Sequence, residues 1–130
     1  MSYNSLMNYL GIDYGSKRIG LAVATKGIIE PISAIKNDQY LFDNLKKIIT
    51  EYQINKIFVG MSEGEFANKT KKFVGELKNM LILTIETTEE AVSTIEADKI
   101  FLDNHKKKKN YKKSIDSISA AVILRRVINS

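Results

Sequence analysis

The chain has 130 residues, of which 44% are hydrophobic and 27% charged, and its formal net charge is +5. This length is enough for one globular domain with a substantial core, and the absence of cysteine excludes disulfides and thiolate chemistry. No run of about 18 apolar residues is present for crossing a membrane. Residues 1–8 lack a signal-peptide pattern and read as a loose end, so we expect a single domain over residues 1–130 in the cytoplasm.

The positive charge is concentrated in one stretch near the C-terminus, the basic segment of residues 106–113. Without its six lysines the formal charge would fall from +5 to −1. A local basic patch on a near-neutral body suits a polyanion such as nucleic acid, although a solvated loop without a partner has the same composition. The lysines are Lys106, Lys107, Lys108, Lys109, Lys112 and Lys113.

Residues 10–24 predict a β-hairpin, because two apolar runs flank a polar turn that contains Gly15 and Ser16. Alternation along the strands would gather bulky side chains on one face, and glycine and alanine on the other. Asp13 lies on the glycine and alanine face, where an unpaired carboxylate is costly. This acid either supports the turn or serves a site that needs open space beside it.

The remaining elements follow from the period of the apolar residues. A third antiparallel strand is expected over residues 28–35, at a sheet edge because Pro31 cannot donate a hydrogen bond. Two further strands are expected at residues 54–61 and 81–88. Three antiparallel strands followed by βα units predict an α/β fold with one mixed five-stranded sheet and helices on both faces, the element order of the ribonuclease H-like fold. Helical spacing predicts helices from about residue 39 to 53, 63 or 65 to 79, 91 to 104, and 114 or 115 to 128.

Acidic residues on three of these elements are candidates for one site. Asp116 begins an apolar stripe on the last helix that should face the sheet, although an acid in a first turn, with Ser114 as the cap, also complements the helix dipole. Glu89 and Glu90 follow a strand whose carboxyl end is a usual place for sites in α/β sheets, although they could serve only to begin a helix.

A site of Asp13, Asp116 and one of the two glutamates would suit a hard divalent cation, since Mg²⁺ prefers oxygen ligands. Two such ions can activate water and stabilise the leaving oxygen during phosphodiester cleavage. The single histidine, His105, has no partner for a histidine-based metal site.

Four segments of the chain carry motifs in a characteristic order. Residues 10–23 form a glycine-rich hairpin, and residues 57–61 read Ile-Phe-Val-Gly-Met. Residues 89–97 begin with two glutamates, and residues 116–124 read Asp-Ser-Ile-Ser-Ala-Ala-Val-Ile-Leu. These segments resemble the signature hairpin, the IVVGLP strand, the DERLTTxEA segment and the last helix of the YqgF family, also called RuvX-like Holliday junction resolvases or pre-16S ribosomal RNA processing nucleases. The resemblance extends over residues 9–128.

The resemblance implies a ribonuclease H-like nuclease that uses Mg²⁺ or Mn²⁺, with two ions expected, to hydrolyse phosphodiester bonds. It implies Asp13, Glu90 and Asp116 as catalytic metal ligands, and so selects the second glutamate of the pair. Lys17 and Arg18 would hold a substrate phosphate, and the basic segment would supply salt-sensitive affinity. The implied substrate is precursor 16S rRNA or a Holliday junction, and a two-fold junction would favour a homodimer.

Two departures from the family pattern keep other functions open. Ala91 stands where the family has the arginine of its Asp-Glu-Arg motif, and the loop at residues 61–65 is shortened. A nucleic-acid-binding module that has lost catalysis is therefore the main alternative, and metal titration would distinguish it. An actin-like or sugar-kinase ATPase also begins with such a hairpin, but needs two domains where this length supplies one. A purely structural role for all three acids would require three coincidences.

Overall fold

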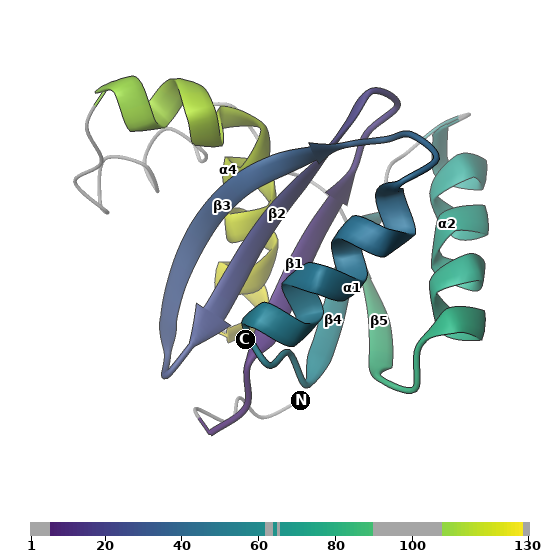
Figure 1. Cartoon of the computed structure of the whole chain (residues 1–130), viewed down its shortest axis with the longest axis horizontal. Coiled ribbons are helices and arrows are strands. Elements are labelled where there is room, and N and C mark those ends of the chain that lie inside the picture. Colours follow the sequence, from purple (N-terminus) through teal and green to yellow (C-terminus); the bar gives the residue numbers. More distant parts are fainter. Residues whose placement is uncertain (1–5, 62–63, 65, 90–107, 129–130) are drawn as a thin grey trace.

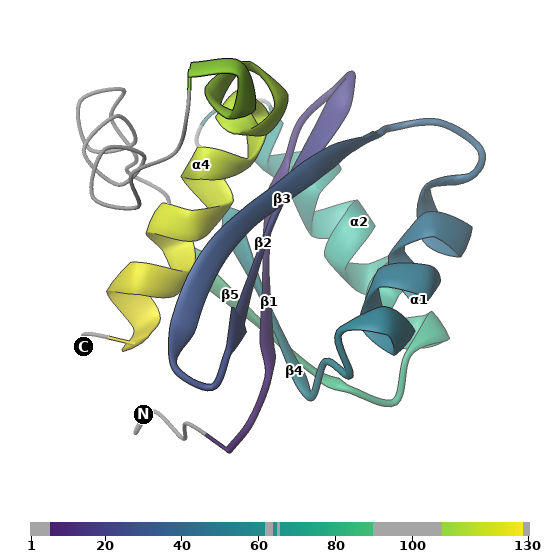
Figure 2. The same ribbon diagram turned by 60° about the vertical axis from the view of Figure 1, so that its left-hand side comes forward.

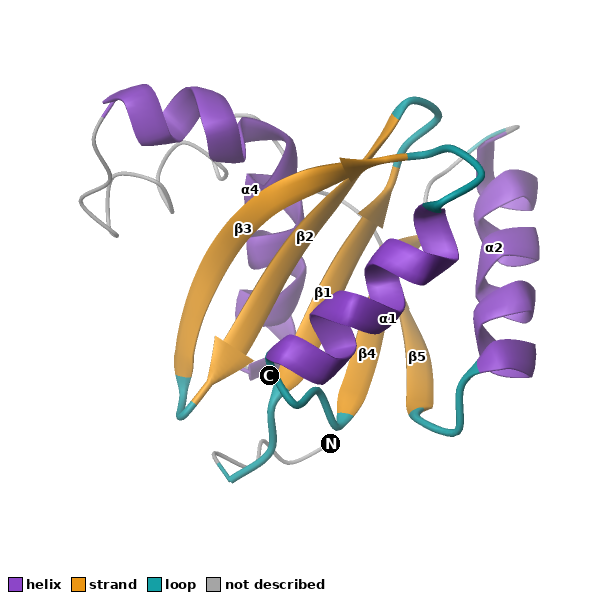
Figure 3. Cartoon of the chain, in the orientation of Figure 1, coloured by secondary structure: helices purple, strands orange, loops and turns teal. Residues whose placement is uncertain are grey.

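The computed structural model describes residues 6–61, 64, 66–89 and 108–128; for Glu89 and residues 108–116 it describes the backbone alone. A single mixed sheet with strand order β3-β2-β1-β4-β5 forms its centre (Figure 3). The first three strands are antiparallel neighbours, and β4 and β5 run parallel to β1. The strands are β1 (Tyr9–Tyr14), β2 (Arg18–Thr25), β3 (Ile28–Lys36), β4 (Lys56–Met61) and β5 (Thr84–Glu89).

Three described helices cover both faces of this sheet. Helices α1 (Leu41–Glu51) and α2 (Phe66–Met80) pack on one face, and α4 (Lys108–Ile128) crosses the other (Figures 1 and 2). The predicted mixed five-stranded sheet with helices on both faces is confirmed. The helix predicted over residues 91–104 lies outside the described residues. None of the helices in the described part of the chain is long and apolar enough to cross a membrane.

The last helix begins earlier than the sequence analysis predicted. It starts at Lys108, so residues 108–113 of the basic segment are helical and not a loop. Apolar periodicity could not reveal this start, because the first turns are made of lysine, which favours a helix without marking a buried face. Ser114 is therefore not a helix cap, and Asp116 lies beyond the first turn, where the helix dipole no longer explains an acid.

The other boundaries differ from the predicted ones by a few residues. The second helix begins at Phe66 and ends at Met80, and β5 begins at Thr84, after a bend at residues 82 and 83. Strand β3 is an edge strand, as Pro31 predicted.

At the N-terminal side, Asn8 is held by the loop after α1, because its amide side chain donates to the carbonyl oxygen of Tyr52 at 2.9 Å.

The two faces of the sheet have different cores, as the alternation in the hairpin predicted. Large aliphatic side chains such as Leu10, Ile12 and Leu21 fill the space under α1 and α2. On the opposite face, α4 packs against small residues, including Ala22 and Ala24, together with the rings of Tyr9 and Phe58. Gly11 lets the helix come close, since a Cβ there would lie 2.7 Å from the carbonyl oxygen of Ala120 and 2.8 Å from Cγ of Leu124.

A buried hydrogen bond fixes α4 against the sheet. The backbone N–H of Leu21 donates to Oγ of Ser117 at 3.0 Å. Leu21 lies beside an irregularity in the pairing of β2 with β3, between Ile19 and Leu21. A helix side chain thus satisfies a backbone donor of β2, and it fixes the position of the middle of α4 along the strand.

Candidate active site

The carboxyl ends of three parallel strands form the candidate site. Asp13 is half-buried at the end of β1 and pairs with Gly20 of β2 and Gly60 of β4. Gly60 in turn pairs with Thr88 of β5. Residues in register across a sheet share a face, so these four residues form a row on the face that α4 covers. With a glycine on each side of it, the Asp13 carboxylate has no neighbouring side chain along this row.

Gly60 and Thr88 are two residues of this row that the sequence analysis did not single out. Gly60 ends the buried run of β4, and its missing side chain opens the space between Asp13 and Thr88. Oγ1 of Thr88 is buried and makes no hydrogen bond within the described part of the chain. A buried hydroxyl without a partner is costly, so this atom is available to a ligand at the row. Only the strand register, and no local sequence signal, could have revealed it.

The backbone of α4 brings Asp116 to the same end of the sheet. Ala120 lies against Gly11, and Ser117 bonds to Leu21, which is the register partner of Ile12. Towards its N-terminus the helix therefore advances along β1 towards Asp13. Asp116 directly precedes Ser117, so its backbone lies beside the end of the hairpin that carries Asp13. The side chain of Asp116 lies outside the described residues.

The third predicted acid, Glu90, also lies outside the described residues. Its neighbour Glu89 ends β5 and is the register partner of Met61, one residue beyond the row that contains Asp13. Among the side chains that the structure describes, no three acidic, histidine or cysteine groups come together as a metal site. Asp13 is the one predicted ligand whose side chain lies among the described residues, so the triad remains a prediction.

The predicted phosphate-binding residues lie on the turn between β1 and β2. Lys17 and Arg18 are exposed, and the turn beneath them is held in place by Asn37. The side chain of Asn37 donates to the carbonyl oxygen of Gly15 at 2.8 Å, and its backbone N–H donates to that of Lys17 at 2.9 Å. Gly15 is needed in this turn, because a Cβ there would collide with the carbonyl oxygen of Arg18.

The basic segment has two parts in the structure. Lys106 and Lys107 lie outside the described residues, whereas the backbone of Lys108, Lys109, Lys112 and Lys113 forms the first turns of α4. Their side chains are not described. Because Asp116 follows on the same helix, the helical lysines lie on the element that also carries a candidate metal ligand.

The strand order and the helices on both faces define a domain with the ribonuclease H-like fold. A search of solved structures supports this class. The chain resembles the fowlpox virus Holliday junction resolvase with a TM-score of 0.67 over 95% of this chain and 99% of the viral chain. At 15% identity, this likeness establishes the fold alone.

Family membership follows from the sequence comparisons. The model of the RuvX family, described as Holliday junction resolvase, matches residues 7–130. A relative from Sulfurihydrogenibium sp. (strain YO3AOP1), described as "Putative pre-16S rRNA nuclease", is 41% identical over 125 residues, 88% of this chain and 85% of the relative. A relative from Halothermothrix orenii with the same description is 30% identical, over 95% of each chain. The chain belongs to the RuvX family, and the predicted resemblance to a family of nucleases is confirmed.

Membership of a nuclease family makes the protein a hydrolase of phosphodiester bonds with nucleic acid as its partner. The reading as a fragment of an actin-like or sugar-kinase ATPase is excluded, because the family match covers residues 7–130.

Proposed function

We propose that this chain is a single-domain, divalent-metal-dependent nuclease of the cytoplasm that processes precursor 16S rRNA. The relatives from Sulfurihydrogenibium and Halothermothrix, which match along almost their whole length, support this substrate by their descriptions. The observation that supports the site most strongly is Asp13, which is half-buried between Gly20 and Gly60 at the carboxyl end of β1. A half-buried carboxylate at the end of a strand, with a glycine on each side of it in the sheet, has room beside it for a ligand.

The residues at this end of the sheet fit a hard divalent cation. Asp13 offers carboxylate oxygens, and the hydroxyl of Thr88, which has no hydrogen-bond partner among the described residues, offers a further oxygen in the same row. Oxygen donors of this kind suit Mg²⁺ and Mn²⁺. We propose Asp13, Glu90 and Asp116 as the ligands, with two ions. Bound in pairs, such ions supply an activated water and stabilise the oxygen that leaves phosphorus.

The protein's own residues would position the nucleic acid around this chemistry. Lys17 and Arg18, on a turn fixed by Asn37, would bind a phosphate next to the scissile one. The lysines in the first turns of α4, together with Lys106 and Lys107, would bind the backbone without sequence preference, so their contribution would fall with rising salt. The departure at Ala91 removes one positive group of the family motif, and these lysines would compensate for it.

A Holliday junction is the second candidate substrate. The description of the matching family and the fold of the viral resolvase favour it. A junction has two-fold symmetry, so a nuclease that resolves it would act as a homodimer. The alternative of a binding module without catalysis predicts nucleic-acid affinity that needs no divalent metal.

Cleavage by the purified protein tests the proposed function. Labelled precursor 16S rRNA, a four-way DNA junction and an unstructured RNA would each be incubated with Mg²⁺ or Mn²⁺, with and without EDTA. We expect cleavage of the precursor that EDTA abolishes. Cleavage of the junction alone would favour the second substrate. Tight, salt-sensitive binding without metal-dependent cleavage of any substrate would overturn the proposal in favour of the binding module.

Single substitutions then test the proposed ligands. Asp13→Asn, Glu90→Gln and Asp116→Asn should each abolish cleavage, because each removes one charged ligand while preserving shape. Glu89→Gln is the matched control, since Glu89 neighbours Glu90 and ends β5. Equal losses in the Glu89 and Glu90 variants would contradict the assignment of Glu90.

A further inference from the structure

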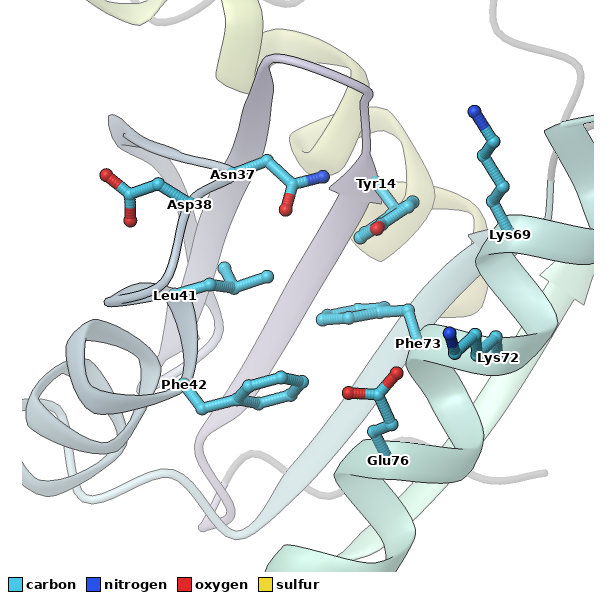
Figure 4. A pocket seen from close by; sticks show the side chains of 9 residues that line it. All are labelled: Tyr14, Asn37, Asp38, Leu41, Phe42, Lys69, Lys72, Phe73 and Glu76. Carbon is cyan, nitrogen blue, oxygen red and sulfur yellow. The ribbon is translucent and has the colours of Figure 1, made fainter.

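A pocket lies on the opposite face of the sheet from Asp13. It is enclosed by the end of β1, the loop that leads from β3 to α1, and the sides of α1 and α2 that face each other (Figure 4). Its volume is about 390 Å³, which lies within the range of about 300–1,000 Å³ that is typical of small-molecule sites. No residue of the predicted nuclease site lines this pocket.

Aromatic rings form one wall of the pocket. The rings of Tyr14 and Phe73 stack with centroids 4.4 Å apart and planes at 25°. Phe42 continues the row on the other side of Phe73, at 5.9 Å and 26°. Phe73 is buried, whereas Tyr14 and Phe42 are only half-buried and line the opening. Phe73 lies between the other two rings, and Phe66 stacks on Tyr14 at 5.7 Å and 26°. The row therefore presents ring edges to the pocket, and the face of a planar heterocycle can lie against such edges in an edge-to-face contact.

The polar side chains around these rings are of the kinds that a nucleotide needs. Lys69 and Lys72 lie three residues apart on α2, so they share one side of the helix, and both are exposed at the pocket. Glu76 follows one turn later, and Asn37 and Asp38 lie across the pocket (Figure 4). Ammonium groups bind phosphate, while amide and carboxylate oxygens accept hydrogen bonds from the amino groups of bases.

The pocket adjoins the nuclease site through a single residue of β1. Tyr14 follows Asp13, and successive residues of a strand point to opposite faces. Asn37, which lines the pocket, is also the residue that fixes the turn carrying Lys17. A nucleic-acid strand that crosses the end of β1 would therefore pass from Asp13, over Lys17 and Arg18, to the pocket.

We propose that this pocket binds one unpaired nucleotide of the substrate strand, next to the phosphodiester that is cleaved. The face of the base lies against the ring edges of Tyr14 and Phe42, and Lys69 and Lys72 bind its phosphate. The pocket thus selects a substrate that is single-stranded beside the cleavage point. This inference rests on the proposed nuclease function, because it assigns the pocket to the strand that Asp13 acts on.

Binding to a non-cleaving variant tests the pocket. Asp13→Asn protein would be titrated into a set of short single-stranded RNAs that carry the fluorescent base 2-aminopurine at one position each. Contact with the aromatic rings changes the emission of this base, so we expect a fluorescence change at one position and little at the others. In the same background, Lys69→Ala with Lys72→Ala should weaken binding about tenfold and reduce the slope of log K against log salt by about one to two.

Lys47→Ala with Lys78→Ala is the matched control. It removes the same charge from exposed positions on α1 and α2 that do not line the pocket. Equal weakening of RNA binding by the two double variants, or fluorescence changes spread evenly along the RNA, would overturn the proposal that the pocket binds a nucleotide. Both double variants alter exposed side chains, and thermal melting verifies that they fold. A separate cleavage assay tests the nuclease function, which fails if the unsubstituted protein shows no metal-dependent cleavage.

Discussion

Around Asp13 the two faces of the sheet differ in the size of their side chains, and this difference separates two tasks. On the face under α4, glycine and alanine let a helix lie close to the strands. On the face under α1 and α2, large aliphatic and aromatic side chains hold the helices further out and form the pocket beside Tyr14. Small residues next to an acid suit chemistry at a charged centre, whereas stacked rings suit binding. Asp13 and Tyr14 place both tasks on adjacent residues of one strand.

The largest effects are expected from separate substitutions of Asp13 and Tyr14, because each variant should lose one of the two tasks. Asp13→Asn should lower the cleavage rate at saturating substrate more than about 100-fold, because loss of even an outer partner of a metal site costs about 10–100-fold. Tyr14→Leu should leave that rate nearly unchanged and weaken RNA binding up to about tenfold, since an edge-to-face aromatic contact contributes about 0.5–1.5 kcal/mol.

Single-turnover cleavage and equilibrium binding, measured on both variants, distinguish the two effects. If the Tyr14 variant lost cleavage as completely as the Asp13 variant, the two faces would not have separate tasks. Circular dichroism of both proteins provides the control for folding.

The next effect concerns the close approach of α4. Gly11→Ala should lower the free energy of unfolding by about 1–3 kcal/mol, because the new methyl group would meet the backbone of Ala120, which cannot turn aside. Gly75→Ala is the control on α2, where a Cβ would meet nothing within 4 Å. There we expect a gain of about 0.5–1 kcal/mol from helix propensity.

Denaturant unfolding of the two variants measures this difference. Similar stability of the two proteins would mean that α4 can move away from β1 at little cost. Close packing of α4 would then not require small residues beneath it, and the difference between the faces would have no effect on stability.

Much of this contrast was predictable from the sequence, because alternation in residues 10–24 separates the faces without any knowledge of the partner helix. Asp13 was found as an acid in an apolar strand, and the order of elements predicted the sheet. The row that joins Asp13 to Gly60 and Thr88 was not predictable. It depends on the register between strands that are far apart in the chain, and local periodicity contains no information on register.

The last helix shows a second limit of the sequence analysis. Its buried stripe was visible from residue 116 onward, but its lysine-rich start was read as a loop. Charge and composition describe the patch, and they are the same for a helix and for a loop. The aromatic pocket was missed for a related reason: Tyr14, Phe42 and Phe73 lie on three elements, and each alone reads as an ordinary core residue.

A smaller effect is expected at Thr88, on the face under α4, whose buried hydroxyl makes no hydrogen bond to the residues that the structure describes. Thr88→Val preserves shape and removes the hydroxyl, so stability should hold or rise slightly. If the hydroxyl orients a metal ligand or its water, affinity for Mg²⁺ should fall about tenfold. Titration calorimetry with Mg²⁺ measures this affinity without any cleavage. Thr87→Val is the control, since Thr87 is exposed on the other face. Unchanged affinity in the Thr88 variant would remove this residue from the site.

The smallest effect is expected at Glu86, an acid on the same face as Asp13 but near the edge of the sheet. Its carboxylate pairs with Nζ of Lys56 at 2.9 Å, and 45% of its side chain is exposed. The Lys56 side chain is only 12% exposed, so the pair is open to water on the Glu86 side alone and contributes about 1 kcal/mol, and less at high salt. Glu86→Gln should therefore lower the free energy of unfolding by no more than that, and leave cleavage and Mg²⁺ affinity unchanged. Denaturant unfolding at low and high salt, with a cleavage assay, measures both. A loss of cleavage comparable to that of Asp13→Asn would mean that the acidic site extends along β5 towards Glu86, because an ion pair with Lys56 alone gives no reason for such a loss.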